Sequence, residues 1–157
     1  MTYTQSPHLS ETEVIDFLNY VSVARVCTIN KDGTVHAAPV WFYYSSGKVI
    51  FGSPDKSIKV KNIRRNNQVT VLVDQEGPPT RGVIIYGEAE ISEENMDEIA
   101  LEIFRRRMEE TRAREYREGL FKLTKWVAVI VTPKKIASYD YLKDTRYRQA
   151  TRFMRND

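Results

Sequence analysis

The sequence has 157 residues, of which 41% are hydrophobic and 29% charged. This length and composition suit one globular domain, so we expect a single domain over residues 1–157. The formal net charge of +3 implies no strong global electrostatic field. Cys27 is the only cysteine, which excludes an intramolecular disulfide and a thiol-rich metal site.

Two further function classes are disfavoured by the sequence. It carries no charged-then-apolar N-terminal signal and no apolar run of membrane length, so we expect a soluble, cytoplasmic protein with no membrane partner. The two histidines, His8 and His36, are not placed to form a zinc cluster or a catalytic triad with Cys27. We therefore expect no metal.

The chain begins with a helix and a hairpin. Ser10 and Glu13 have the spacing of a capping box, and the apolar residues that follow recur on one helical face: Val14, Phe17, Leu18 and Val21. Residues 23–30 and 35–44 then have the composition of two strands, and Asp32-Gly33 favours a tight turn between them.

The second strand of this hairpin is unusual in two respects. Pro39 interrupts it, and because proline donates no ladder hydrogen bond we expect an edge, a bend or a bulge there. The next five residues, Val40–Tyr44, are all apolar or aromatic, which predicts that both faces of the strand are covered. One face would meet a barrel core. The other would meet a partner subunit, a flat ligand or the rest of the same chain.

A third strand, Val49–Gly52, leads into a polar loop and a short basic helix. Ser57, or Asp55 just before it, can cap the start of this helix. The first helical turn has backbone N–H groups without intrahelical partners, and such groups favour an anion. This stretch therefore predicts a place for a phosphate.

The basic residues of this helix fall into two groups according to the side of the helix on which they lie. Val60 and Ile63 define its apolar stripe, and the cations that project away from the stripe are expected to be solvated: Lys61, Arg64 and Arg65. Lys59 instead falls beside the stripe in the first turn. From there its ammonium can reach past the helix start, which makes Lys59 with Ser57 a candidate phosphate site.

The remaining elements alternate between strand and helix. Strands are expected at 68–74, 83–91, 126–132 and 136–139, two helices within 93–125, a loop without sheet at 75–82, and a loose basic helix at 146–155. Hairpin order with inserted helices indicates a mainly β (α+β) fold: a six- to seven-stranded antiparallel split barrel with peripheral helices.

The order of several short segments resembles the flavin-binding split-barrel family related to pyridoxamine 5'-phosphate oxidase, and the subgroup that uses FMN or a deazaflavin. The resemblance covers about Ser10 to Lys143 and depends on the sequence order Pro39-Val40-Trp41-Phe42, Val49-Ile50-Phe51, Ser57-Ile58-Lys59, Asn62-Ile63-Arg64-Arg65 and Gly87-Glu88-Ala89-Glu90.

The resemblance implies roles for individual residues. Ser57 and Lys59 match phosphate-binding positions, Val40 and Trp41 lie where the backbone runs along the flavin ring, and Ser53 matches a hydroxyl near the cofactor. The family resemblance further implies a homodimer with cofactor sites at the interface, which makes Arg81 a candidate contact from the partner. An arginine before the phosphate-binding lysine is replaced here by Ile58, so oxidation of pyridoxamine phosphate itself is not expected.

Three functions remain open at this stage. The first is an FMN-binding oxidoreductase that passes hydride or electrons to a small planar substrate, or a related deazaflavin-dependent reductase. The second is a non-catalytic flavin-binding carrier or sensor. The third is a nucleic-acid-binding module, which is disfavoured because the aromatic residues lie in a strand that is expected to be buried.

Overall fold

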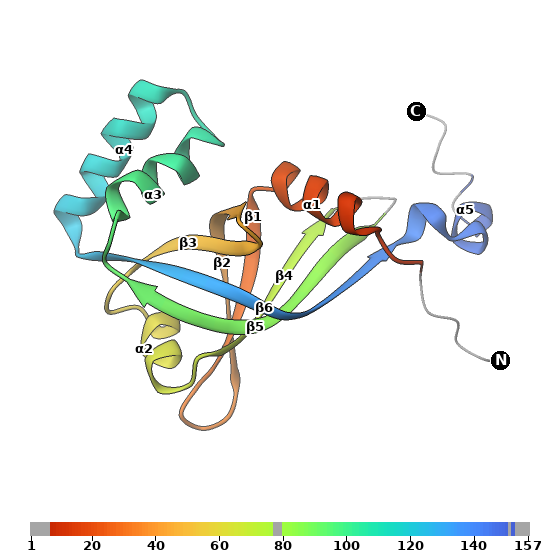
Figure 1. The fold of residues 1–157 in the computed structure, drawn as a ribbon, viewed down its shortest axis with the longest axis horizontal. Helices are drawn as coiled ribbons and strands as arrows, with labels where there is room; N and C mark the ends of the chain where they lie inside the picture. The colour runs from red at the N-terminus through yellow and green to blue at the C-terminus, as the bar shows by residue number, and fades with distance from the viewer. Residues whose placement is uncertain (1–6, 77–79, 151, 153–157) are drawn as a thin grey trace.

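The structure is a computed structural model of the chain and describes residues 7–76, 80–150 and 152. The strands are β1 (Val23–Ile29), β2 (Val35–Ser45), β3 (Lys48–Pro54), β4 (Gln68–Gln75), β5 (Arg81–Ser92) and β6 (Trp126–Asp140). The helices are α1 (Glu11–Tyr20), α2 (Ile58–Arg65), α3 (Met96–Arg105), α4 (Glu110–Leu123) and α5 (Thr145–Ala150), with a 3-10 turn at Tyr141–Lys143 (Figure 1).

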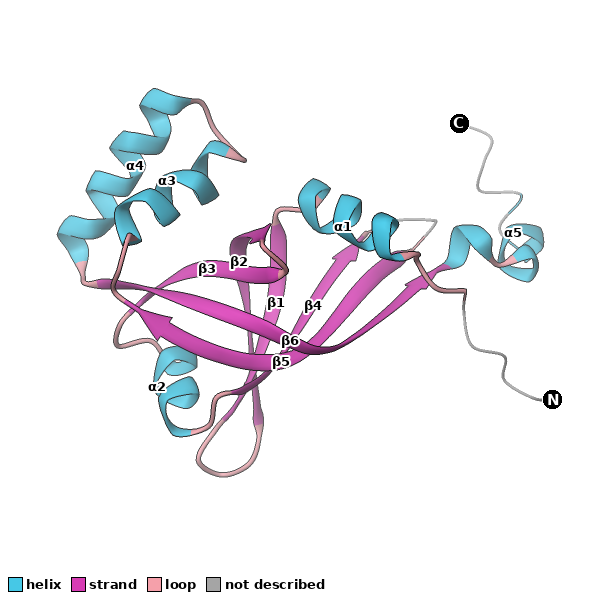
Figure 2. Cartoon of the chain, in the orientation of Figure 1, coloured by secondary structure: helices cyan, strands magenta, loops and turns pink. Residues whose placement is uncertain are grey.

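The strands form a closed barrel in the order β1-β2-β3-β6-β5-β4, and β4 pairs again with β1. All neighbouring strands are antiparallel. Figure 2 shows the helices at the periphery of this barrel, with α3 and α4 together at one end and α5 beyond the other. The predicted antiparallel split barrel with peripheral helices is confirmed, with six strands in the described part of the chain.

The barrel core follows from the alternation of side chains along each strand. On β4, for example, Val69, Val71 and Val73 are buried, whereas the residues between them are half-buried. Helix α1 closes the core with Phe17 and Leu18. Its predicted capping box is present, because Glu13 N–H donates to Ser10 Oγ and Ser10 N–H donates to the Glu13 carboxylate.

The prediction of two separate strands at 126–132 and 136–139 was wrong. Residues 126–140 form one strand across Pro133, not two strands. Pro133 pairs with Gly87 beside a bulge between Tyr86 and Gly87, and a proline without an N–H is tolerated at such an irregularity. Gly87 is required there, since a Cβ on it would lie 2.4 Å from the Thr132 carbonyl oxygen.

One smaller expectation also needs correction. The loop expected at 75–82 is shorter, because Gln75 ends β4 and Arg81 begins β5, where the two residues pair. Residues 77–79 lie outside the described part of the structure. The described part of the basic tail forms a helix over Thr145–Ala150, as expected, and most of the expected continuation to residue 155 lies outside the described residues.

The Val40–Tyr44 run is covered on both faces, as predicted, and the chain itself supplies much of the second cover. Val40 and Phe42 are buried in the barrel. Trp41 and Tyr43 point outward and pack against the apolar side of α3 and α4. Pro39 lies where β2 pairs with β1, and the pairing of β2 with β3 begins only at Phe42. This is the edge position expected for a proline.

Arg106 attaches the α3–α4 hairpin to the barrel. Its guanidinium donates to carbonyl oxygens at the end of α1 and on β2: Leu18 (3.4 Å), Asn19 (2.6 Å), Val21 (3.2 Å) and Phe42 (3.2 Å). A cation at the C-terminal end of a helix also interacts favourably with the helix dipole. This one side chain therefore connects α3, α1 and β2.

We predict that Arg106→Gln lowers the free energy of unfolding by about 1.5 to 3 kcal/mol, because a charged donor to several carbonyl groups is lost. The neighbouring substitution Arg105→Gln is the matched control. It removes an ion pair with Glu110 that is exposed on both sides, so it should cost about 1 kcal/mol or less. Urea unfolding of the three proteins measures the difference, and equal losses would contradict the role of Arg106.

Candidate functional site

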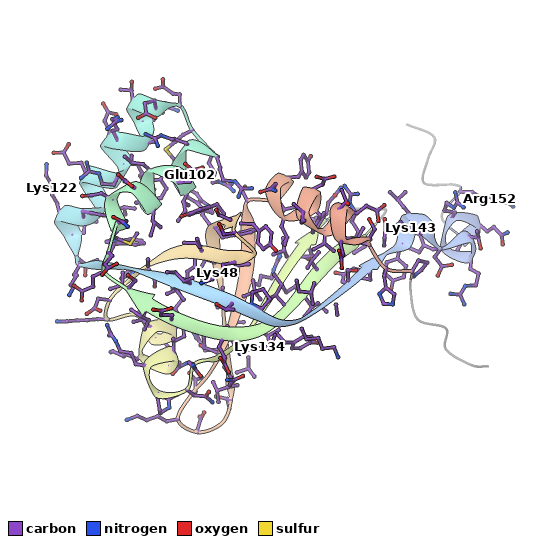
Figure 3. All side chains as sticks on the ribbon, in the orientation of Figure 1. Lys48, Glu102, Lys122, Lys134, Lys143 and Arg152 are labelled. Carbon is purple, nitrogen blue, oxygen red and sulfur yellow. The ribbon has the colours of Figure 1, made fainter. Side chains whose placement is uncertain are left out.

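A cavity of about 290 Å³ lies between the barrel wall and the α3–α4 hairpin. The barrel contributes Val40, Trp41 and Gly52, and α2 contributes Lys59. The helical side is apolar and includes Ile103, Phe104, Tyr116 and Leu120. Figure 3 shows Glu102 and Lys122 on the same helical hairpin; neither residue lines the cavity. The cavity is therefore mostly apolar, with a cation from α2.

Aromatic side chains form one wall of the cavity. The rings of Trp41 and Phe104 meet edge to face with centroids 6.0 Å apart, and Tyr116 lies 4.9 Å from Phe104 and 5.9 Å from Trp41. The Arg107 guanidinium lies 4.6 Å from the Trp41 ring centroid. Trp126 is fixed by a hydrogen bond from Nε1 to the Leu120 carbonyl (3.3 Å). Such a wall suits a flat ring.

Gly52 leaves part of the cavity wall as bare backbone. A Cβ on this residue would lie 3.0 Å from Met96 Cε and 3.4 Å from Trp126 Cε3. A side chain would therefore fill the space where β3 faces α3. Because Gly52 has none, Met96 and Trp126 pack closely against the β3 backbone at the cavity wall.

Lys59 is a half-buried cation in the cavity wall. Burial lowers the pKa of its ammonium below the ordinary value. No acidic side chain of the described residues forms an ion pair with it. A cation that is partly desolvated and lacks a counter-ion attracts an anionic ligand.

Two serine hydroxyls lie at the start of the same helix. Ser57, not Asp55, is the N-cap of α2, and its Oγ accepts from the Val60 N–H at 3.4 Å. Ser53 is fully buried, and its Oγ lies 2.9 Å from Ser57 Oγ. Asp55 instead forms an ion pair with Arg64. A hydroxyl pair, the α2 N-terminus and the Lys59 ammonium thus occur within one short segment.

The cations expected on the outer face of α2 are exposed, but two of them also have structural contacts. Arg64 pairs with Asp55 and donates to its carbonyl. Arg65 donates to the Ile29 carbonyl of β1. Lys61 is exposed. These contacts hold α2 against the barrel and point away from the cavity residues.

The structure places three of the six residues expected at a cofactor in the cavity wall: Val40, Trp41 and Lys59. Ser53 on β3 and Ser57 at the start of α2 do not line the cavity; they bond to each other beside the lining residues Pro54 and Lys59. Arg81 lies elsewhere in the same chain. Its Nε donates to Gln75 Oε1 (3.0 Å), and its guanidinium lies 5.3 Å from the Phe17 ring centroid. A contact of Arg81 with the site of a second chain stays a prediction.

Sequence reasoning missed the helical wall of the cavity. The apolar stripe of α3 was visible as Met96, Ile103 and Phe104, but the spacing alone indicates only that this face is covered. Tyr116 and Trp126 gave no separate signal. They become site residues because the hairpin folds back over the outward face of β2.

Comparison with known proteins places the chain in one family. The family model described as pyridoxamine 5'-phosphate oxidase matches residues 10–139. A search of curated proteins found no match. In the described part of the chain, no helix combines the length and apolarity needed to cross a membrane.

Three solved structures with the same fold illustrate the range of proteins that this chain is similar to. The conserved hypothetical protein Rv2991 from Mycobacterium tuberculosis is 25% identical, with a TM-score of 0.75 over 88% of this chain and 91% of that one. An FAD-binding protein from Mycobacterium smegmatis is 24% identical (TM-score 0.60; 85% and 98% covered). An F420 reductase is 22% identical (TM-score 0.61; 77% and 93% covered).

The desolvated charge of Lys59 gives a prediction for the ligand-free protein. Because folding lowers the pKa of this lysine, its charge opposes folding at neutral pH, and this penalty decreases as the pH rises from the lowered pKa toward the ordinary value of 10.5. Lys59→Met should therefore raise the melting temperature at pH 7, with a smaller gain at pH 10. Lys61→Met, on the exposed side of α2, is the control. A lower melting temperature for Lys59→Met would show that the ammonium has a stabilising partner.

Proposed function

This chain belongs to the pyridoxamine 5'-phosphate oxidase family, and we propose that it is an oxidoreductase that binds FMN and acts on a small planar substrate. The observation that carries the proposal is the Lys59 ammonium, which opens onto an aromatic-walled cavity without an acidic partner in the described structure. A deazaflavin coenzyme is the alternative cofactor, and the likeness to an F420 reductase supports keeping it.

The residues present fit a phosphate at one end of the site. Lys59 supplies the charge, and the α2 N-terminus supplies free backbone N–H groups. Ser57 Oγ accepts from the Val60 N–H and can receive a second proton from Ser53. Its own hydroxyl proton is then free to be donated to a phosphate oxygen.

The fit for the ring is equally specific. Trp41, the β2 backbone at Val40 and Gly52 on β3 line the cavity opposite the aromatic side chains of the α3–α4 hairpin. The flavin supplies the hydride or electron transfer, and the protein supplies binding, orientation and exclusion of water. The apolar side chains of α3 and α4 perform this exclusion over one face of the site. No side-chain acid or base is required.

The small size of the cavity supports the proposal that one chain does not form the whole site. A volume of about 290 Å³ is at the lower end of the range for small-molecule sites. Val23 and Pro39 line the cavity where β2 pairs with β1 but not with β3. We propose that a second copy of the chain completes the site there, in a homodimer with cofactor sites at the interface.

An apolar strip beside this part of the cavity supports the homodimer. Val35 (60% exposed), Ala37 and Pro39 point outward along β2. On β1, Cys27 pairs with Ala37 and extends the strip by one strand. Arg25, which forms an ion pair with Asp74, lies between Pro39 and Leu72 of β4 and bounds the strip on that side. Monomers rarely leave such a strip uncovered, and a two-fold interface covers it on both copies at once.

A nucleic-acid-binding role finds no support in the positions of the aromatic residues. Trp41 and Tyr43 are covered by α3 and α4, so they do not form an open stacking platform. A non-catalytic flavin carrier would use the same site. Reduction of the bound cofactor by a small planar donor, or its oxidation by an acceptor, distinguishes the enzyme from the carrier.

We predict that FMN binds more tightly than riboflavin, which has the same ring and lacks the phosphate. Lys59→Ala should weaken FMN binding roughly 10- to 150-fold, because a charge-assisted contact worth about 1.5 to 3 kcal/mol is lost. Riboflavin binding should change little. Lys61→Ala, from the exposed side of the same helix, is the matched control. Fluorescence titration gives all the affinities, and an unchanged FMN affinity in Lys59→Ala would remove this residue from the site.

We also predict that the dimer is required for FMN binding. Val35→Glu places a carboxylate in the proposed interface and should yield a monomer with at least a 10-fold weaker FMN affinity, since a buried unpaired charge is costly. Tyr20→Glu alters a more exposed residue on α1 (76% against 60% for Val35) and should leave both properties unchanged. Light scattering measures the mass. A wild-type monomer that binds FMN tightly would refute the shared site.

A further inference from the structure

One buried polar side chain fixes α2 to the barrel. Asn62 is only 4% exposed. Its amide nitrogen donates to Thr28 Oγ1 (3.1 Å) and to Asn30 Oδ1 (2.8 Å), both on or next to β1. Its amide oxygen accepts from Arg65 Nη2 (3.0 Å). Both amide protons and the amide oxygen are thus used, and Thr28 is itself fully buried.

The apolar packing of α2 does not determine its rotation as closely. Val60 and Ile63 bury the apolar stripe of the helix, but apolar contacts have no preferred direction. A helix of eight residues also has little stability of its own, so its position depends on its contacts. Hydrogen bonds are directional, and a buried amide that rotates away from its partners is left unsatisfied.

The same helix carries the proposed phosphate contacts. Asn62 lies one turn after Lys59 and five residues after Ser57, so a rotation or a shift of α2 moves all three together. We propose that Asn62 is a positioning residue: by bonding to Thr28 and Asn30 it sets the orientation in which Lys59 and Ser57 meet the phosphate. This inference rests on the proposed function and adds the hydrogen bonds that make the site selective for a phosphorylated cofactor.

The test uses the two ligands that differ only in the phosphate. Asn62→Leu removes the three hydrogen bonds and keeps a side chain of similar size. It should weaken FMN binding about 10-fold, as expected when a charge-assisted contact is misaligned, and leave riboflavin binding within about 2-fold. Circular dichroism establishes that the variant is folded at the temperature of the titration.

A matched pair at Thr28 tests the same contact from the barrel side and serves if Asn62→Leu does not fold. Thr28→Val removes the hydroxyl that accepts from Asn62 and keeps the shape, whereas Thr28→Ser keeps the hydroxyl. We expect Thr28→Val to lose part of the preference for FMN and Thr28→Ser to retain it.

The outcomes separate this inference from the proposed function. A wild type that binds FMN and riboflavin equally well would overturn the phosphate site itself. A wild type that prefers FMN, together with an Asn62→Leu variant with the same preference, would overturn only the positioning role. Equal weakening of both ligands in Asn62→Leu would also overturn it, because a general structural role affects the ring and the phosphate alike.

Discussion

The structure depends on the need to cover both faces of the aromatic part of β2. Val40 and Phe42 fill the barrel, and the outward Trp41 and Tyr43 must also be removed from water. The α3–α4 hairpin does this by folding back over the strand, and Arg106 holds it there. The cover is incomplete at Val40 and Trp41, where β2 is not paired with β3, and the cavity occupies that gap. A requirement of barrel packing thereby creates an apolar site.

The second constraint is electrostatic. A barrel with an apolar external cavity has no need of a lysine in the cavity wall, and burying the Lys59 ammonium disfavours its charged form. The position becomes favourable when an anion is bound, since the anion restores the charged state. The polar contacts of Asn62 and Arg65 hold the helix against β1 and so keep the ammonium in this position. The proposed site thus combines a packed apolar wall with a charge that has no acidic partner among the described residues.

The features that the sequence predicted correctly depend on contacts between residues that are close together in the chain. Ser10 and Ser57 cap helices through bonds to residues three positions away. The spacing predicted the Ser10 cap, and at the second helix it left Ser57 and Asp55 as alternatives. Pro133 led to the wrong prediction of two strands in place of β6, because a proline is accommodated there only through the bulge at Gly87 on another strand. Tyr116 and Trp126 could not be assigned to the site, since their place follows from how the hairpin folds over β2. Arg81 was predicted as a contact from a partner chain, and one chain leaves that prediction untested.

The most direct measurement is a crystal structure of the protein grown with FMN. The account predicts a phosphate within hydrogen-bond distance of Ser57 Oγ and Lys59 Nζ, with the ring between the β2–β3 backbone at Val40 and Gly52 and the aromatic side chains of α3 and α4. A phosphate bound elsewhere, or a ring outside this cavity while the Lys59 ammonium faces solvent, would contradict it.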